Sequence, residues 1–242
     1  VLFFAAAGIL CAYELSHNYE KLNVYCGAWV MFVYIGAQAL LALFHAGTTA
    51  YIACMAGSIY LALFDGIIRH KVSGDGAVYT IMGLAYPSFL FGLLMMISVS
   101  PKWLEVLTLA CLSTWVCDSF ALFGGKRFGK HRVAPSVSPN KTVEGCICGF
   151  VSALVTGVVI YYILGLCRGI PLWLCVLTCA VASTMGQIGD LAESLIKRMI
   201  GVKDFSNLIP GHGGMFDRAD SLLFSIPTAY ICLFIFGYAS IG

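Results

Sequence analysis

"PLWLCVLTCAVASTMGQIGDLAESLIKRMIG", residues 171–201, is the stretch that decides the fold class. As a helix its residues would extend about 45 Å at 1.5 Å per residue, which exceeds the roughly 30 Å hydrocarbon core of a bilayer. Its first half is almost wholly apolar, whereas its second half carries acids, a lysine and an arginine. The stretch therefore predicts a membrane-spanning helix whose polar end projects beyond the hydrocarbon.

The rest of the chain has the composition of an integral membrane protein. Of its 242 residues, 60% are hydrophobic and 11% are charged, and the mean hydropathy is +0.90, far above the values of ordinary soluble domains. The sequence shows no alternation of apolar and polar residues of the kind that membrane barrel strands have. Because lipid cannot form hydrogen bonds with unpaired backbone groups, we expect an all-α polytopic bundle with about eight transmembrane helices. The apolar runs are 1–15, 24–44, 48–64, 78–99, 104–123, 142–166, 171–201 and 219–241.

The basic residues indicate which helix ends face the cytoplasm. With the spans numbered in order, twelve Lys and Arg residues lie in or beside the loops after the odd-numbered spans, and two, Lys102 and Arg168, lie in the others. By the positive-inside rule, residues 124–141 and 202–217 are then cytoplasmic loops. Orientation alone accounts for the basic residues of the first two such loops.

Residues 124–141 form the more basic of the two long loops. Between Gly125 and Lys141 there are five Lys or Arg residues, one His and no acid, interleaved with glycine and proline, so we expect no single regular helix there. A cationic, glycine-rich turn can surround phosphate oxygens with backbone N–H groups. Anionic lipid headgroups would also suit such a loop, and both ligands stay open.

The polar end of residues 171–201 has a helical pattern of its own. A carboxylate near lipid is costly unless it faces a partner or a wet cavity, which favours a function for Asp190. The alternatives are an ion pair of Asp190 with Lys197 or Arg198, and a simple surface pair of Glu193 with Lys197. Two glycines just before Asp190 would let another backbone or a ligand approach closely. The residues at spacings of three and four, on one helix face, are Gln187, Asp190, Glu193, Ser194 and Lys197.

A second pair of acids, Asp217 and Asp220, lies on the first turn of the last expected span. Helix capping is the alternative interpretation of each. Together with Asp190, and with Asp118 at the end of an earlier span, they would form a cluster of carboxylates. Hard oxygen donors of this kind hold Mg²⁺ around a phosphate. The bases expected around the cluster are Lys197, Lys203, His212 and Arg218.

Residues 194–220, "SLIKRMIGVKDFSNLIPGHGGMFDRAD", resemble the C-terminal motif of the phosphatidate cytidylyltransferases, also called CDP-diacylglycerol synthases. The resemblance continues through "QIGDLAES" (187–194), "SPNKTVEG" (138–145) and "DSFALFGGKRFGKH" (118–131). It covers residue 118 to the end, with departures at Ala219, Phe120 and Leu122 that remove no charge. It therefore predicts a catalytic region at 118–242 and, in the same bundle, scaffold helices at 1–117 that could also form a dimer surface.

The resemblance implies that CTP and phosphatidic acid react to CDP-diacylglycerol and pyrophosphate with Mg²⁺, and with room for a second cation. The partners expected are these substrates, membrane lipids and a second copy of the chain, with no nucleic acid, and the active site is expected to face the cytoplasm. Asp190 and Asp217 would be the main metal ligands, and Asp220 and Asp118 further ligands or orienting groups. The catalytic residues would be Asp190, Asp217, Lys197 and Lys203. Substrate contacts would come from Lys141, Arg218, Ser138, Asn140, Ser194, His212 and Lys130.

Two alternative functions remain from the sequence. Polyprenol or phytol kinases and CDP-archaeol synthases are related membrane enzymes that also use CTP and a lipid. An ion or phosphate transporter, of a different class, would also keep acids and bases within its spans, but here the charges gather at one face and no internal repeat is evident. The products formed from labelled CTP would distinguish these functions.

Overall fold

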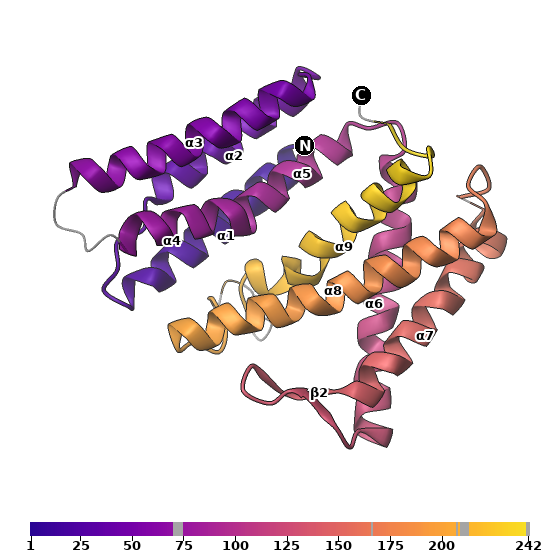
Figure 1. Ribbon diagram of the computed structural model, residues 1–242. Helices are drawn as coiled ribbons and strands as arrows, with labels where there is room; N and C mark the ends of the chain where they lie inside the picture. The colour runs from indigo at the N-terminus through magenta and orange to yellow at the C-terminus, as the bar shows by residue number, and fades with distance from the viewer. Residues whose placement is uncertain (70–74, 166, 207, 209–212, 241–242) are drawn as a thin grey trace. The chain divides into compact units, whose positions relative to one another are not determined.

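The computed structural model describes residues 1–69, 75–165, 167–206, 208 and 213–240. Helices account for most of these residues (Figure 1), so the all-α architecture is confirmed. The helices are α1 (Leu2–Glu20), α2 (Ala28–Leu43), α3 (Thr48–Ile68), α4 (Asp75–Gly83), η1 (Leu84–Ser88), α5 (Phe89–Ser98), α6 (Trp103–Phe128), α7 (Val143–Val159), η2 (Ile160–Leu164), α8 (Leu172–Ile200) and α9 (Phe216–Ile235).

Each expected apolar run corresponds to one helical segment. The π-helical turn η1 joins α4 and α5 into one segment. It contains Pro87, which has no backbone N–H to donate to a helical hydrogen bond. In the described part of the chain, six segments are long and apolar enough to cross a membrane. They start at α3, and α1 and α2 are not among them, so the expectation of about eight spans stays a prediction for these two helices. The six are Thr48–Ile68, Asp75–Ser98, Trp103–Phe128, Val143–Leu164, Leu172–Ile200 and Phe216–Ile235.

The chain divides into two compact units. The first unit comprises residues 1–99 and 199–219, and the second comprises residues 100–198 and 220–240. The predicted division after residue 117 is one of function, and it stays a prediction.

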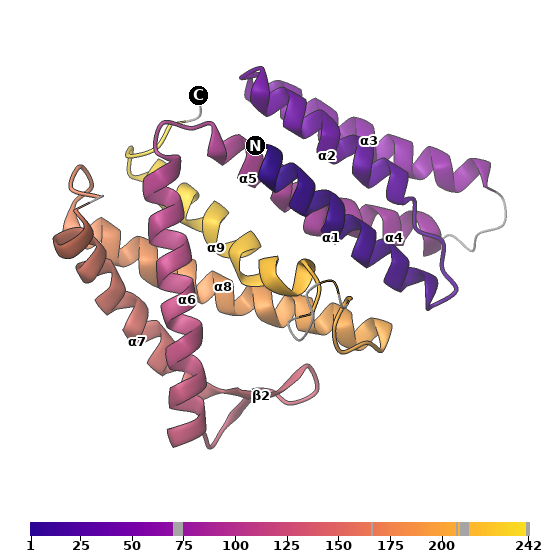
Figure 2. The ribbon, with the colours of Figure 1, turned by 180° about the vertical axis from the view of Figure 1, so that it is seen from behind.

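In the first unit, α1, α2 and α5 run side by side, as both ribbon views show (Figures 1 and 2). The core between them is built from fully buried Leu15, Tyr34 and Met95. A Cβ on Gly8 of α1 would come within 3.0 Å of the Phe91 ring of α5. Because glycine has no side chain, these two helices can lie close together.

In the second unit, α6 and α7 pack closely against each other. A Cβ on Gly124 of α6 would lie 2.6 Å from Cys148 of α7, and a Cβ on Gly145 of α7 would lie 2.6 Å from the carbonyl oxygen of Ala121. Small residues at such crossings let membrane helices approach closely. Gly124 and Gly125 thus belong to a helix contact, and the prediction that they begin a glycine-rich loop is wrong.

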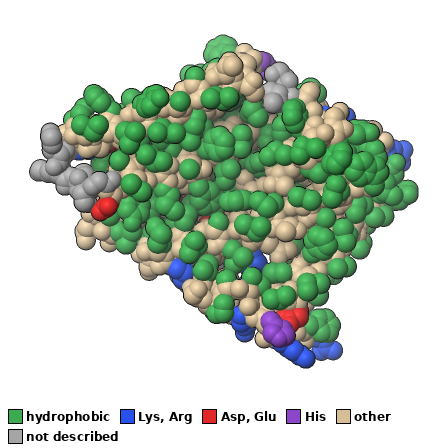
Figure 3. All heavy atoms as spheres, in the orientation of Figure 1, with side chains coloured by type: hydrophobic (Ala, Val, Ile, Leu, Met, Phe, Trp, Pro, Cys, Tyr) green, Lys and Arg blue, Asp and Glu red, His purple; other side chains and the backbone are tan. Residues whose placement is uncertain are grey.

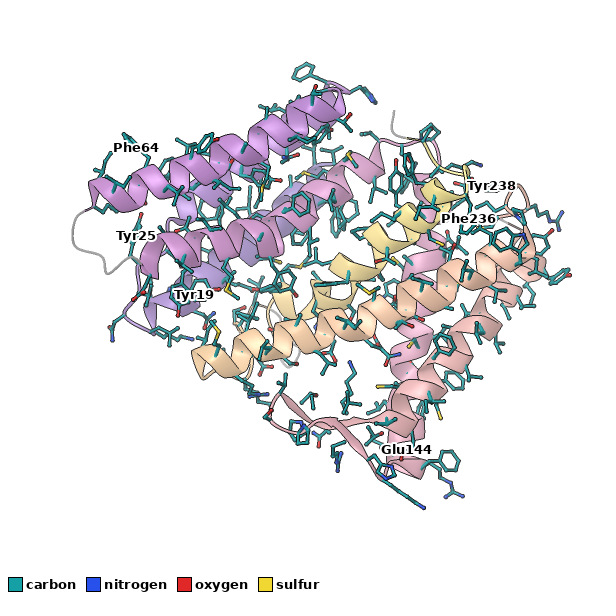
Figure 4. All side chains as sticks on the ribbon, viewed as in Figure 1. Tyr19, Tyr25, Phe64, Glu144, Phe236 and Tyr238 are labelled. Atoms are coloured by element: carbon teal, nitrogen blue, oxygen red, sulfur yellow. The ribbon has the colours of Figure 1, made fainter. Side chains whose placement is uncertain are left out.

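The basic segment after α6 folds as a small hairpin, which an all-α expectation did not include. Strands β1 (Arg132–Ala134) and β2 (Ser138–Thr142) are antiparallel. Glu144, at the start of α7 (Figure 4), accepts hydrogen bonds from the backbone N–H groups of Lys130 and His131 and contacts the His131 ring. One acid from the next helix therefore fixes the base of a hairpin that contains none.

The outward surface is apolar, as a lipid environment requires. Figure 3 shows hydrophobic side chains over most of the face in view. On α3, Ile52, Tyr60 and Ile67 are each about 70% exposed. Large exposed apolar surfaces are rare on soluble monomers, so this surface and the six apolar segments define an integral membrane protein.

Candidate active site

Asp190 on α8 forms the central ion pair of the second unit. The Lys141 ammonium of β2 donates to Asp190 Oδ2 at 2.7 Å and to the Gln187 carbonyl oxygen at 2.8 Å. The Lys141 side chain is 13% exposed and that of Asp190 is 37% exposed. Both residues were expected in the site from the sequence, but their pairing with each other was not expected.

Gln187, one turn before Asp190, anchors this part of α8. Its side-chain amide donates to the Cys117 sulfur of α6 at 3.1 Å and lies near the Cys146 carbonyl oxygen of α7. The position of α8 is thereby tied to both members of the α6 and α7 pair. Since Asp190 follows Gln187 on the same helix face, its carboxylate is fixed relative to these helices.

Two further acids of the second unit lie near Asp190. The negative charges of Asp118 on α6 and Asp220 on α9 each interact with the charge of Asp190. Lys141 offsets the charge of Asp118, and Lys197 that of Asp220. We call Asp118, Asp190 and Asp220 the acidic cluster. Three helices therefore bring like charges together, although the residues are far apart in sequence.

Close packing of α8 and α9 brings Asp220 to this position. A Cβ on Gly189 would lie 2.6 Å from the Asp220 carbonyl oxygen, and one on Gly186 would lie 3.0 Å from Thr114 of α6. The prediction that the glycines before Asp190 allow another backbone to approach is confirmed. The Asp220 carboxylate also accepts the N–H of its neighbour Ser221 at 2.6 Å.

The positions of the acids bear on whether this site can bind Mg²⁺. Nowhere in the described ranges do three or more His, Cys, Asp or Glu residues gather closely enough to hold a metal ion. Protein-bound Mg²⁺, however, commonly takes only one or two carboxylates and completes its octahedron with phosphate oxygens and water. The carboxylates of the acidic cluster are hard oxygen donors of the kind that Mg²⁺ takes, and the binding of Mg²⁺ by them stays a prediction.

Lys197 is held by a buried acid one helical turn away. Its ammonium lies 2.5 Å from a carboxylate oxygen of Glu193, whose side chain is fully buried. The alternative that Glu193 pairs with Lys197 is confirmed, but the pair is buried, so its expected place on the surface is wrong. Ser194, a predicted substrate contact, is also buried on α8.

The hairpin residues lie beside the end of α8. Arg198 donates from Nε to the Val137 carbonyl oxygen at 3.2 Å, which ties the hairpin to that helix. Of the predicted substrate contacts here, Ser138 is half-buried, and Asn140 and Lys130 are exposed. The structure thus places these three residues on the segment that also carries Lys141.

Asp217 belongs to the first unit, where it closes the loop before α9. Its Oδ2 accepts the backbone N–H groups of Gly214 at 2.8 Å and of Phe205 at 3.0 Å. Gly213 has a φ of +82°, and a Cβ there would come within 3.0 Å of the Asp217 carboxylate. A carboxylate that reaches back to the preceding backbone resembles the acid of a capping box, so the capping interpretation describes contacts that Asp217 makes here.

The same loop is attached to α1 by a residue that was not among the predicted site residues. Glu14 accepts hydrogen bonds from the Ser206 hydroxyl and from the backbone N–H groups of Met215 and Phe216. Asn18, one turn later, donates to the Phe205 carbonyl oxygen at 2.7 Å. An acid inside the apolar run 1–15 was the available signal, since such an acid requires a partner.

The remaining predicted residues are placed as follows. Lys203 and Arg218, both in the first unit, are exposed. His212 lies outside the described residues. Asp190 and Asp217 belong to different units, and their sharing of one cation stays a prediction.

Fold and site together define a class: a polytopic membrane protein whose long helices bring acids and lysines together within one unit. Residues 1–236 match the sequence profile of the cytidylyltransferase family. The chain belongs to that family. The resemblance indicated by its motifs is confirmed.

Its relatives include named proteins from several bacteria. The chain is 35% identical over 179 residues to a phosphatidate cytidylyltransferase of Staphylococcus saprophyticus, a match that covers 74% of this chain and 67% of the relative. A protein of the same name from Staphylococcus aureus is 33% identical over the same shares. One from Bacillus subtilis is 46% identical over 127 residues, 52% of this chain and 46% of the relative.

Proposed function

We propose that this chain transfers the cytidylyl group of CTP to phosphatidic acid, forming CDP-diacylglycerol and pyrophosphate. The observation that carries the proposal is the Lys141 and Asp190 pair at the polar end of α8, in a chain whose relatives are named phosphatidate cytidylyltransferases. The pair holds a cation and an acid together near the end of a membrane-spanning helix. A lipid phosphate and a water-soluble triphosphate can both arrive there.

The chemistry needs positioning more than a strong base. A phosphate monoester has a second pKa of about 6 and is largely doubly ionised near neutral pH. One of its oxygens attacks the α-phosphorus of CTP, and the bond from that phosphorus to the bridging oxygen breaks. Pyrophosphate leaves with the bonding electrons. The protein must align two anions and offset their repulsion.

The lysines of the second unit supply the positive charge. Lys141 is oriented by Asp190 and the Gln187 carbonyl oxygen, and it would contact a substrate phosphate from there. Lys197 is oriented by Glu193 in the same way. Both ammonium groups are held by acceptors before substrate arrives, which lowers the entropic cost of binding a phosphate.

Magnesium would be held by Asp190 together with Asp118 or Asp220, and Asp217 is proposed as a further ligand. When bound, the ion would neutralise charge on the triphosphate and on the leaving pyrophosphate. The remaining positions of the ion would be filled by phosphate oxygens and water.

We also propose that the active site faces the cytoplasm and that two copies of the chain associate. The cytoplasmic orientation is supported by the twelve-to-two distribution of basic residues. Native mass spectrometry of the protein released from nanodiscs would measure the number of copies.

Two radioactive labels test the proposed reaction. The purified protein is incubated with phosphatidic acid, Mg²⁺ and CTP labelled at either the α- or the γ-phosphorus, and lipid is extracted. We expect the α-label in the lipid and the γ-label in pyrophosphate. γ-Label in the lipid with release of CDP would indicate a kinase instead, and no label in lipid from either CTP would refute the proposal.

A further inference from the structure

Glu14 of α1 lies against the N-terminus of α9, within the first unit. Its Oε1 accepts the Ser206 hydroxyl at 2.5 Å and the Met215 N–H at 3.0 Å, and its Oε2 accepts the Phe216 N–H at 2.9 Å. Glu14 is 5% exposed. A buried carboxylate is costly unless hydrogen bonds replace its water, and here three donors do so.

These contacts make Glu14 a cap supplied from a distant helix. The first N–H groups of a helix have no partner within it, and residues just before the helix usually satisfy them. Here the acceptor comes from about 200 positions earlier in the chain. A negative charge at a helix N-terminus is also favoured by the helix dipole, and hydrogen bonds to an ionised acceptor are the stronger kind.

The loop before α9 is shaped to receive this carboxylate. A Cβ on Gly214 would lie 2.6 Å from both oxygens of Glu14, so the backbone passes directly against them. Asn18 holds Phe205 at the other end of the loop, and the Phe205 and Phe216 rings lie 4.7 Å apart between their centroids. Helix α1 therefore fixes both the beginning of this loop and its end at α9.

We propose that Glu14 is a positioning residue for the transfer reaction, because it sets the direction in which α9 presents Asp217 and Arg218. This rests on the proposed function, in which these two residues serve the chemistry. Glu14 acts through the backbone of Met215 and Phe216. It links the N-terminal helices, which carry none of the recognisable motif, to the loop that carries most of it.

The test compares Glu14→Gln with Glu20→Gln in the full chain. Both variants change an acid to its amide on α1, but Glu20 is exposed and pairs only with His17 among the contacts of its carboxylate that the structure describes. In Glu14→Gln an amide NH₂ replaces one acceptor oxygen and faces a donor. We expect kcat to fall about 10- to 100-fold, with the KM for CTP within about threefold of wild type. Glu20→Gln should keep both values.

Hydrogen exchange separates positioning from general destabilisation. In Glu14→Gln the amides of Met215 and Phe216 should exchange at least about tenfold faster, while amides of α6 and α7 keep their rates. Unchanged exchange at Met215 and Phe216 would overturn the proposal, since Glu14 would then not hold α9. Faster exchange with a wild-type kcat would also overturn the proposal, since the hydrogen bonds of Glu14 to α9 would then not contribute to catalysis.

Ser206→Ala is a second variant that leaves the carboxylate in place. It removes one of the three donors to Glu14, and we expect kcat to fall about three- to tenfold. In the double variant the losses should be less than additive, because both changes act on one contact. If Glu14→Gln fails to fold, a wild-type kcat in Ser206→Ala overturns the proposal. A wild-type protein without transfer activity would refute the proposed function, and exchange at Met215 and Phe216 would still report whether Glu14 holds α9.

Discussion

Replacing Lys141 by Gln should weaken the transfer reaction strongly while leaving the fold intact. Glutamine keeps a hydrogen-bond donor, one bond closer to the backbone than the lysine ammonium, but removes the positive charge. Asp190 would lose its cationic partner, and the substrate phosphate would lose a cationic contact. The change therefore tests whether the ion pair on α8 belongs to the chemistry or only to the architecture.

The size of the effect follows from the geometry. The Lys141 ammonium lies 2.7 Å from Asp190 Oδ2 and is mostly buried, whereas the Asp190 side chain is 37% exposed. A hydrogen bond from the Lys141 ammonium to a substrate phosphate would be of the charged kind, which contributes about 1.5–3 kcal/mol, and the partial exposure of the site places it in the lower half of that range. A loss of about 2 kcal/mol corresponds to a roughly 30-fold lower kcat/KM.

The assay measures pyrophosphate release at varied CTP in mixed micelles that contain phosphatidic acid. Lys102→Gln is the matched control, because Lys102 forms a similar ion pair with Glu105 at 2.8 Å in a loop that the charge distribution places on the other side of the membrane. We expect the control to keep wild-type kcat/KM. The Lys141→Gln variant should also show less than additive losses when combined with Asp190→Asn.

A Lys141→Gln variant within about threefold of wild type would refute this reasoning, because surface substitutions alone produce changes of that size. An equal loss in Lys102→Gln would do the same, since the effect would then follow from removing any paired lysine. Melting temperatures of the two variants in detergent would show whether either change acts through stability.

Two further predictions concern the packing that supports the site. Glu193→Ala removes the buried partner of Lys197, and breaking such a pair costs about 3–5 kcal/mol. The melting temperature should therefore fall by roughly 10 °C. A fall no larger than that of Glu105→Ala would contradict this prediction. Gly124→Ala places a Cβ 2.6 Å from a neighbouring side chain and should destabilise the protein by about 1–3 kcal/mol. Gly57→Ala is the control: no atom lies within 4 Å of its new Cβ, so the change should be neutral or stabilising. Equal melting temperatures of the Gly124→Ala and Gly57→Ala variants would contradict the close contact between α6 and α7.

The positions of the helices could be predicted because the hydrophobic signal is local. A run of apolar residues must find lipid or a buried face wherever it lies in the fold. Run 171–201 thus corresponds to α8, and run 48–64 to α3. Helix ends were less predictable: α6 continues to Phe128, because Gly124 fits the contact with α7 and glycine is tolerated where helices cross closely.

The helical face of the site was also predictable, but its pairings were not. Spacing alone places Gln187, Asp190 and Lys197 on one side of α8. The partner of Asp190 is Lys141, 49 positions earlier, and no local pattern indicates which of many lysines the fold brings to an acid. The nearest bases in sequence were the natural candidates, and the hairpin supplied the cation instead.

Glu14 shows the same difficulty over a longer distance. Its donor Ser206 is 192 positions away, and the run that contains Glu14 is otherwise apolar. Sequence analysis indicates only that a buried acid needs donors. Which donors these are depends on how the loop before α9 folds back, so the contact became visible only in three dimensions.

Formation of CDP-diacylglycerol by Asp190→Asn, next to wild type, tests the central claim most directly. Asparagine has the same shape and keeps an oxygen that accepts the Lys141 hydrogen bond, and Asp190 is partly exposed, so the melting temperature should fall by less than in Glu193→Ala. The account predicts that wild type converts CTP and phosphatidic acid to CDP-diacylglycerol and that the variant retains about 1% of that rate or less. Near-normal turnover by a folded Asp190→Asn protein would contradict the assignment of the polar end of α8 as the active site.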